Sequence, residues 1–265
     1  MIAKPAAHLL ATDASGLALF EHCPDLELAG VIVPANRNGS DKIAQLRDAA
    51  AKRGLPLAEQ PRGGNLPSDL PPADIAVSWM YSQILPPEDL PRYSLGMLNM
   101  HGGHIPRYRG ANVLQWAIIN GEPELWITWH EIVAEVDAGA IWAEAPLPLP
   151  QDWTALQARA AMIEAGIALF PQAWRRKREG LPPARLPDLS QGKVWPTRRP
   201  RDGAIEPGWS ERQLHDFLRA LCPPWPLPTW QGRDVLGVAD RAEADTEAYA
   251  CADGAILHLR LAKAP

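Results

Sequence analysis

Short apolar runs separated by helical stretches constrain the fold of this chain more than any other feature. The runs at Ala7 to Ala11, Leu28 to Val33, Ile75 to Trp79 and Gly96 to Asn99 have strand length, and Ser40 to Arg53 has the pattern of a helix. This alternation predicts an α/β fold with a Rossmann-like, mostly parallel sheet and helices on both of its faces. Ligand sites in such sheets lie beyond the carboxyl ends of the strands, where Trp79 and Asn99 fall.

The second half of the chain is predicted to add more elements and a separate C-terminal part. We expect a helix at 111–120, strands at 125–132 and 140–147, a long helix capped by Asp152, a helix at 210–221 capped by Ser210, and strands at 234–238 and 255–261. Residues 181–201 are rich in proline, which is typical of an irregular connection. The predicted organisation is a domain over residues 1–180, then a linker, a helix and a small β-rich module over residues 181–265.

Composition argues against several classes of protein. The formal net charge of −5 and the pI of about 5.8 leave no broad basic surface for a nucleic acid bound through many phosphates. The 3 cysteines are scattered and lack C-x-x-C spacing, so neither a disulfide framework nor a zinc site is predicted. No apolar window approaches the ~20 residues of a membrane span, and the N-terminus has too short an apolar run for a signal peptide. We expect a cytoplasmic protein with no metal, no nucleic acid and no membrane as partner.

Two polar side chains close one of the apolar runs and can act together. Asn99 and His101 are two residues apart at the end of a predicted strand, so both side chains leave the same face if the strand geometry persists. A Gly-Gly pair follows, and its backbone N–H groups can approach a ligand that a Cβ would hold off. Asp137, in the sequence VDAG, can return a carboxylate toward the same strand end.

These residues carry a resemblance to a known family. N-x-H, a short loop, P-x-Y-R-G, a helix with WAIINGE and then D-x-G resemble the 10-formyltetrahydrofolate-dependent formyltransferases over residues 75–145. The resemblance implies that Asn99, His101 and Asp137 are catalytic, that residues 1–180 form the catalytic domain, and that 10-formyltetrahydrofolate is a co-substrate. The family loop that commonly reads S-L-L-P is here Gly103, His104, Ile105 and Pro106.

The three residues suit a reaction whose tetrahedral intermediate carries an anionic oxygen. The side-chain NH₂ of Asn99 can donate to that oxygen. His101 titrates near neutrality and can move the amine proton, while Asp137 can stabilise the imidazolium or accept the proton through water. The sequence leaves open which of the two takes the proton. An isolated histidine is better explained by the core, and an isolated aspartate in D-x-G by a turn, but the combination of His101 and Asp137 at these positions favours the catalytic roles. The catalytic role of Asn99 is favoured over that of a turn cap at the strand end. His130 is better explained by packing and hydrogen bonding than by direct catalysis.

The folate donor needs an apolar slot with backbone partners for its pterin. By resemblance, the expected contacts are Trp79, Met80, Tyr81, Gln83 and Ile84 on one side, Gly103, His104, Ile105 and Pro106 in the turn, and Glu135 and Val136 on the other side. Trp79 and Ile84 are equally well explained as core residues. Arg109 is expected to brace the turn through its hydrogen bonds. No G-x-G-x-x-G or Walker A sequence appears, so nothing indicates nicotinamide or ATP binding.

Three classes of amine acceptor compete: a nucleotide-linked amino sugar, methionyl-tRNA, and a small amine such as hydroxyornithine. The acidic chain and short C-terminal module favour the first, and HGG, NVLQWAIINGE and RRPRDGAI resemble bacterial nucleotide-sugar N-formyltransferases, including those acting on 4-amino-4,6-dideoxy sugars. Arg198 and Arg199 would then meet the diphosphate, and Trp116 or Trp195 would stack on a base or sugar, although a solvated loop also explains these arginines. Related sugar enzymes are often dimers, so a homodimer is expected. A formyl-folate hydrolase and a binding module without turnover are the alternatives.

Overall fold

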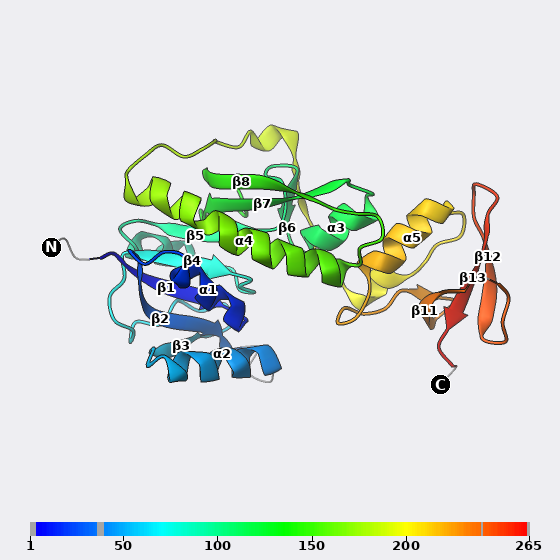
Figure 1. Ribbon diagram of the computed structural model, residues 1–265, viewed down its shortest axis with the longest axis horizontal. Helices are drawn as coiled ribbons and strands as arrows, with labels where there is room; N and C mark the ends of the chain where they lie inside the picture. The colour runs from blue at the N-terminus through cyan, green and yellow to red at the C-terminus, as the bar shows by residue number, and fades with distance from the viewer. Residues whose placement is uncertain (1–3, 36–39, 240, 264–265) are drawn as a thin grey trace. The chain divides into compact units, whose positions relative to one another are not determined.

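A seven-stranded mixed sheet forms the centre of the fold in the computed structural model, which describes residues 4–35, 40–239 and 241–263. In spatial order the strands are β3 (Leu57–Gln60), β2 (Glu27–Pro34), β1 (Ala6–Ala11), β4 (Ile75–Trp79), β5 (Met97–His101), β7 (Glu124–Glu131) and β8 (Ile141–Pro148) (Figure 1). The strands from β3 to β5 pair in parallel, and β7 pairs with β5 in antiparallel fashion. The predicted α/β fold with a mostly parallel sheet is therefore confirmed.

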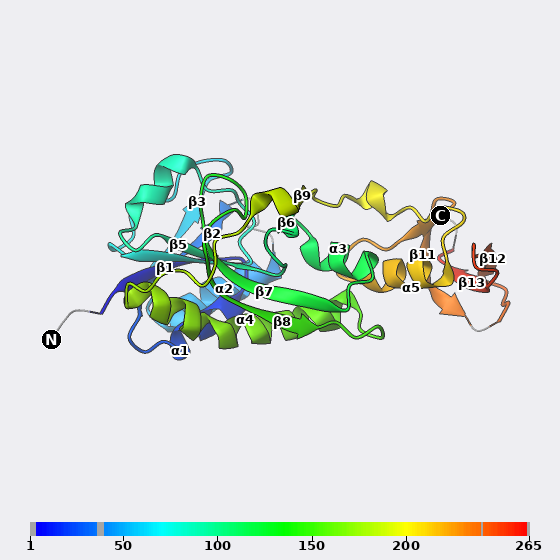
Figure 2. The ribbon, with the colours of Figure 1, turned by 90° about the horizontal axis from the view of Figure 1, so that it is seen from above.

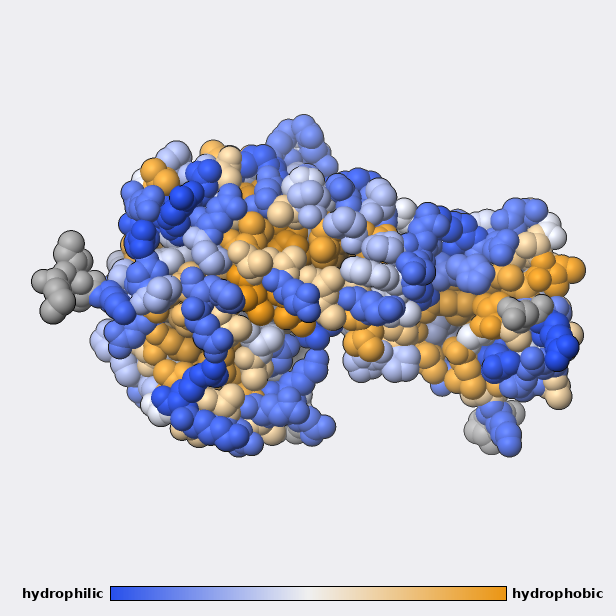
Figure 3. All heavy atoms as spheres, viewed as in Figure 1, coloured by the Kyte–Doolittle hydropathy of each residue, from blue (hydrophilic) through white to orange (hydrophobic). Residues whose placement is uncertain are grey.

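Helices cover both faces of this sheet, as predicted. On one face lies α4 (Ala155–Arg178), whose Gly166 carbonyl accepts a hydrogen bond from Trp129 Nε1 at 2.9 Å. The helix packs closely on the sheet here, because a Cβ on Gly166 would lie 3.0 Å from the Trp79 ring. The opposite face packs a second apolar core that includes Leu10 and Met97 against the loop of the 3₁₀ helix Pro87–Arg92 (Figure 2). The outer surface of α4 carries an apolar patch (Figure 3), in keeping with its alanine-rich sequence.

The remaining elements are short. Their bounds are η1 Ala14–Leu17, α1 Ala18–Glu21, α2 Asp41–Lys52, β6 Tyr108–Gly110, α3 Val113–Ile119, η4 Leu189–Gln191, β9 Lys193–Trp195, η5 Pro200–Gly203, α5 Glu211–Ala220, β10 Thr229–Trp230, β11 Arg233–Ala239, β12 Thr246–Ala250 and β13 Ile256–Leu261. The four last strands form an antiparallel sheet in the order β10-β11-β13-β12, and Ser210 caps α5 as predicted. The predicted Asp152 cap is wrong, because α4 begins at Ala155 and the Thr154 hydroxyl accepts from the Gln157 N–H. Among the described residues, no helix is both long and apolar enough to cross a membrane.

The chain forms two compact units. Unit 1 comprises residues 1–109, 126–145 and 163–193, and unit 2 comprises residues 110–125, 146–162 and 194–265. Unit 2 therefore takes in α3 and the start of α4 as well as the small C-terminal sheet. The boundary at residue 180 between a catalytic and a C-terminal domain stays a prediction.

A buried histidine makes the stability of unit 1 sensitive to pH. His8, 3% exposed on β1, lies with Nδ1 2.8 Å from the Tyr93 hydroxyl and Nε2 2.8 Å from the Pro71 carbonyl. Burial lowers the pKa of His8, the Pro71 bond opposes this, and the Arg92 charge lowers it further. The unfolded chain therefore takes up a proton at a higher pH than the folded protein, so stability is complete above the unfolded pKa and falls as the pH decreases through it.

We expect the free energy of unfolding in urea to decrease as the pH falls below about 6.5, the ordinary histidine value. A His8→Gln variant, which cannot titrate there, should show a flatter pH dependence. His22→Gln, at an exposed position, is the matched control and should keep the wild-type dependence. Equal slopes for wild type and His8→Gln would contradict the prediction.

Candidate active site

A row of polar side chains crosses three adjacent strands of the central sheet. In the strand register, Ser78 on β4 is the direct neighbour of Asn99 on β5, and Asn99 is the direct neighbour of His130 on β7. Ser78 and His130 are 5% and 2% exposed, and Asn99 is half-buried. Because directly opposed residues share a face of the sheet, the three side chains line up side by side on the face opposite α4.

His101 lies on the same face, two residues further along β5. The strand runs to His101 and pairs it with Thr128, so the geometry needed to place Asn99 and His101 together does persist. The loop after β7 brings Asp137 to both histidines: its Oδ2 lies 3.6 Å from His101 Nδ1, and its Oδ1 lies 3.4 Å from His130 Nε2. The three residues predicted to be catalytic are thus gathered in one place, with His130 as a fourth member.

The donor and the acceptor of each hydrogen bond in this row of side chains can be assigned. His130 Nδ1 lies 2.8 Å from the Glu131 carbonyl, which can only accept, so we assign the proton of the neutral ring to Nδ1 and a lone pair to Nε2. Asn99 Nδ2 then donates to His130 Nε2 at 3.0 Å, and the Ser78 hydroxyl donates to Asn99 Oδ1 at 2.8 Å. One N–H of the Asn99 amide is used by His130. The second has no bonded acceptor among the residues that the structure describes.

The same reasoning fixes the reactive nitrogen of His101. Its Nε2 lies 2.5 Å from the Tyr108 carbonyl and must carry the proton, which leaves the Nδ1 lone pair facing Asp137. A Cβ on Gly103 would lie 2.8 Å from that carbonyl oxygen, so a glycine is needed for this approach. Burial lowers the pKa of His101, while Asp137 raises it, His130 lowers it and the Tyr108 bond raises it, with a net decrease. His101 is therefore a neutral base at pH 7 beside a carboxylate that can stabilise its protonated form.

A glycine two residues after Asp137 makes the carboxylate's loop possible. Asp137 has a left-handed backbone with φ of 47°, and a Cβ on Gly139 would meet the Glu131 carbonyl oxygen at 2.0 Å. We expect Gly139→Ala to destabilise the fold by about 1–3 kcal/mol through overpacking and to lower activity roughly tenfold by moving Asp137. Thermal unfolding and kcat measure the two effects. Gly180→Ala, at a left-handed residue with φ of 62° just after α4, is the control: its backbone strain should lower stability but leave kcat unchanged. An equal loss of kcat in both variants would contradict the explanation.

The predicted folate contacts divide between core and surface. The Trp79 side chain is 0% exposed, stacks on Trp129 with ring centroids 6.0 Å apart and lies on the α4 face, so the core explanation fits its indole and a side-chain contact with folate does not. Ile84 is 80% exposed, so the core explanation fails for it. Tyr81 donates to Gln60 and Gln83 donates to the Gln60 carbonyl, which anchors the loop after β4. Met80, half-buried in this loop, has φ of 52°.

Two arginines anchor the turn and the loop that carry the other predicted folate contacts. Arg109 is buried and pairs with Glu135 at 2.7 Å, so it braces the loop that carries Asp137, while the bracing of its own turn stays a prediction. Arg185 binds Glu144 and donates to the Ile105 carbonyl at 2.7 Å. The hydrogen bond from Arg185 to Ile105 anchors the turn that contains Gly103, His104 and Pro106. The ring of His104 packs edge-on against Trp126. Val136 is 41% exposed beside Asp137, where it can contact a ligand.

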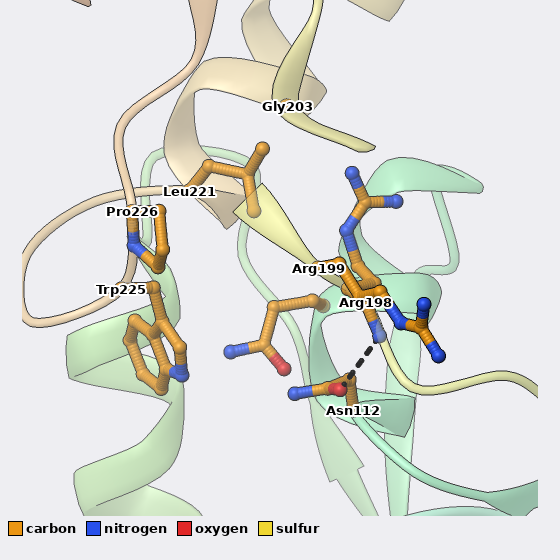
Figure 4. Close-up of a pocket in the computed structure, with 8 residues that line it drawn as sticks. Asn112, Arg198, Arg199, Gly203, Leu221, Trp225 and Pro226 are labelled. Carbon is orange, nitrogen blue, oxygen red and sulfur yellow. Dashed lines mark hydrogen bonds between the residues drawn. The ribbon is translucent and has the colours of Figure 1, made fainter. Parts of the chain in front are cut away.

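The residues predicted to bind the acceptor all belong to unit 2. The Trp116 and Trp195 rings lie with centroids 5.0 Å apart, and the Arg198 guanidinium lies 4.6 Å from the Trp116 ring centroid. A hollow of about 350 Å³, open solvent included, is lined by Asn112, Gln115, Arg198, Arg199, Gly203, Leu221, Trp225 and Pro226, with Trp225 across it from the arginines (Figure 4). Burial lowers the pKa of Arg198, and Asp202 partly offsets this.

Comparison with known proteins shows what the region around this site is similar to. Residues 69–174 match the formyl transferase family, and this range contains the whole row from Ser78 to His130 as well as His101 and Asp137. The resemblance seen in the N-x-H and D-x-G patterns is confirmed. Among the described residues, the structure gathers no group of three or more histidine, cysteine or acidic side chains suited to a metal ion.

Several solved structures share the fold of nearly the whole chain. The sugar 3N-formyl transferase WlaRD is similar with a TM-score of 0.73 and 14% identity, over 99% of both chains. An N-formyltransferase from Helicobacter canadensis is similar with a TM-score of 0.73 and 16% identity, over 99% of this chain and 100% of that one. A 4-N formyltransferase from Francisella tularensis has a TM-score of 0.64 and 15% identity, over 99% and 100%.

Proposed function

We propose that the protein is an N-formyltransferase that moves the formyl group of 10-formyltetrahydrofolate to the amine of a nucleotide-linked amino sugar. The observation that carries the proposal is the gathering of one amide donor, one neutral imidazole and one carboxylate within hydrogen-bonding or ion-pair reach in unit 1. It is also supported by the ligands of the similar structures: WlaRD was crystallised with dTDP and 5-N-formyl-THF, and the Helicobacter canadensis protein with folinic acid and dTDP-3-aminofucose.

The site residues can perform each step of this transfer. The acceptor nitrogen forms a bond to the formyl carbon, and the formyl oxygen takes the negative charge, which the second N–H of Asn99 can stabilise. The attacking amine loses its proton to Nδ1 of His101, since Nε2 is already bonded to the Tyr108 carbonyl. Asp137 stabilises the imidazolium. The same proton then passes to the departing folate nitrogen as its bond to carbon breaks, and the products are the N-formyl sugar and tetrahydrofolate.

The loops around Asp137 fit a folate donor. Ile84, Val133 and Val136 expose apolar side chains on the loops that follow β4 and β7, as a slot for an aromatic ring system requires. We propose that these side chains hold the pterin and that backbone groups of the turn at Gly103 to Pro106 contact it. The donor supplies the formyl carbon, and the protein supplies its position and the proton transfers.

Arg198 and Arg199 are proposed to bind the diphosphate of the acceptor. Both line the hollow of unit 2, and guanidinium groups suit phosphate oxygens. We expect an Arg198→Ala, Arg199→Ala double variant to bind dTDP at least tenfold more weakly, because charged hydrogen bonds contribute about 1.5–3 kcal/mol each. Titration calorimetry at two salt concentrations measures the affinity, and the loss should be larger at low salt. Arg260→Ala is the control, and unchanged affinity of the double variant at both salts would remove the proposal.

A spectrophotometric assay of tetrahydrofolate release tests the function as a whole. The acceptor panel comprises nucleotide-linked 3-amino and 4-amino sugars, hydroxyornithine and methionyl-tRNA. Turnover with a sugar nucleotide is expected, and turnover only with another amine would keep the chemistry and overturn the acceptor. Folate binding without turnover across the panel would favour a binding module instead. A homodimer and a cytoplasmic location stay predictions, and sedimentation equilibrium would test the dimer.

A further inference from the structure

Ser78 is a buried polar residue in an otherwise apolar strand, and formyl transfer as described above gives it no direct role. Its neighbours on β4 are core residues: Ile75, Ala76, Val77 and Trp79 are all 0% exposed. A hydroxyl in such a place must find a hydrogen-bond partner, since an unbonded buried polar group costs about 1–3 kcal/mol. Its partner is the side chain of Asn99, at 2.8 Å.

The place of the Ser78 hydroxyl in the row of hydrogen bonds affects the orientation of the Asn99 amide. The row begins at the Ser78 O–H and ends at the Glu131 carbonyl, with Asn99 and His130 between them. Every link points the same way: Ser78 donates to Asn99 Oδ1, and Asn99 Nδ2 donates to His130 Nε2. If the Asn99 amide turned over, Oδ1 would face the lone pair of His130 Nε2 at 3.0 Å, and two acceptors would meet. In the observed orientation the buried Ser78 O–H donates to Oδ1, whereas a turned amide would present it with Nδ2, which only donates. Ser78 and His130 therefore favour the same orientation, and the Ser78 donor polarises the amide so that the spare N–H of Nδ2 donates more strongly.

We propose that Ser78 is a positioning residue for formyl transfer, which holds the Asn99 amide with Nδ2 toward the reacting centre. The inference rests on the proposed function for its effect on rate, while the orientation of the amide is independent of it. Ser78 touches neither substrate in this account. It acts through Asn99, so its loss lowers the rate of the chemical step and leaves substrate binding unchanged.

Kinetics and imidazole NMR together test this assignment. In Ser78→Ala, kcat should fall roughly three- to tenfold, the worth of one neutral hydrogen bond, with KM unchanged. The ¹⁵N resonance of His130 Nε2 should move toward that of a nitrogen without a hydrogen bond. Ser78→Thr, which keeps the hydroxyl, should restore both. Ser94→Ala, at an exposed position before β5, is the matched control and should change neither.

Each result decides the question. A wild-type kcat in Ser78→Ala would overturn the proposal, and so would a loss of kcat with an unmoved Nε2 resonance or without restoration by Ser78→Thr, because a general packing defect would then explain it. Thermal unfolding of each variant identifies such a defect. Absence of turnover in the wild type would overturn the proposed function instead, and the Nε2 resonance of Ser78→Ala would then decide the Ser78 assignment alone.

Discussion

Replacing His101 with alanine is expected to lower kcat for formyl transfer by about 10²- to 10⁴-fold, the usual contribution of a positioned general base. The lone pair on Nδ1 is the proton acceptor in this site, because Nε2 is committed to the Tyr108 carbonyl at 2.5 Å. KM for both substrates should stay nearly the same, since the ring handles a proton and does not hold either substrate in our account. A loss confined to KM would contradict the role.

The pH dependence of the wild type gives a second measurement of the same role. Protonation of His101 removes the base, so kcat/KM should fall at low pH, and because burial lowers the pKa of His101 the fall should lie below the ordinary histidine value of about 6.5. Asp137→Asn removes the charge that raises this pKa and should move the fall to still lower pH. His22→Ala, at an exposed position, is the control and should leave the profile unchanged. A fall centred above the ordinary value would contradict the assignment.

The sequence was sufficient to predict the central sheet and the members of the site that lie close in the chain. Residues two apart in a strand lie on the same side of the sheet, so the sequence alone places Asn99 and His101 together. Asp137 was predicted through the family resemblance, and its exact reach depends on a tight turn at Gly139. The short strands β3 and β12 were not predicted, because LAEQ and TEAYA are rich in residues that are uncommon in strands.

The register between strands is what the sequence could not supply. Ser78 meets Asn99 only because β4 and β5 pair in one particular alignment, and nothing local to either strand encodes that alignment. Likewise, the bond from Arg185 to Ile105 and the pair formed by Arg109 and Glu135 join distant segments. The one sequence signal for Ser78 was a lone hydroxyl in the apolar run IAVSW. Such a hydroxyl indicates that a buried hydrogen-bond partner is present, but it does not identify that partner.

Replacing Asn99 tests the most direct contribution to catalysis from the row of Ser78, Asn99 and His130, which is the N–H that the Asn99 amide donates. We expect Asn99→Ala to lower kcat by about 10²- to 10³-fold, the usual cost of losing one donor to an oxyanion. The amide supplies the spare N–H at Nδ2, while Ser78 and His130 hold its other polar atoms. As with His101, KM should change little, because the charge on the formyl oxygen develops only after binding.

Asn99→Asp separates the donor from the shape of the side chain. The carboxylate has nearly the same size and can still accept from Ser78, but it has no N–H and would place a negative charge where the intermediate's oxygen becomes anionic. If the donor matters, this variant should be at least as slow as Asn99→Ala. If Asn99→Asp kept most of the wild-type rate, the amide would be a packing element of the row, and the oxyanion would have to be stabilised by the backbone N–H groups of the Gly-Gly turn instead.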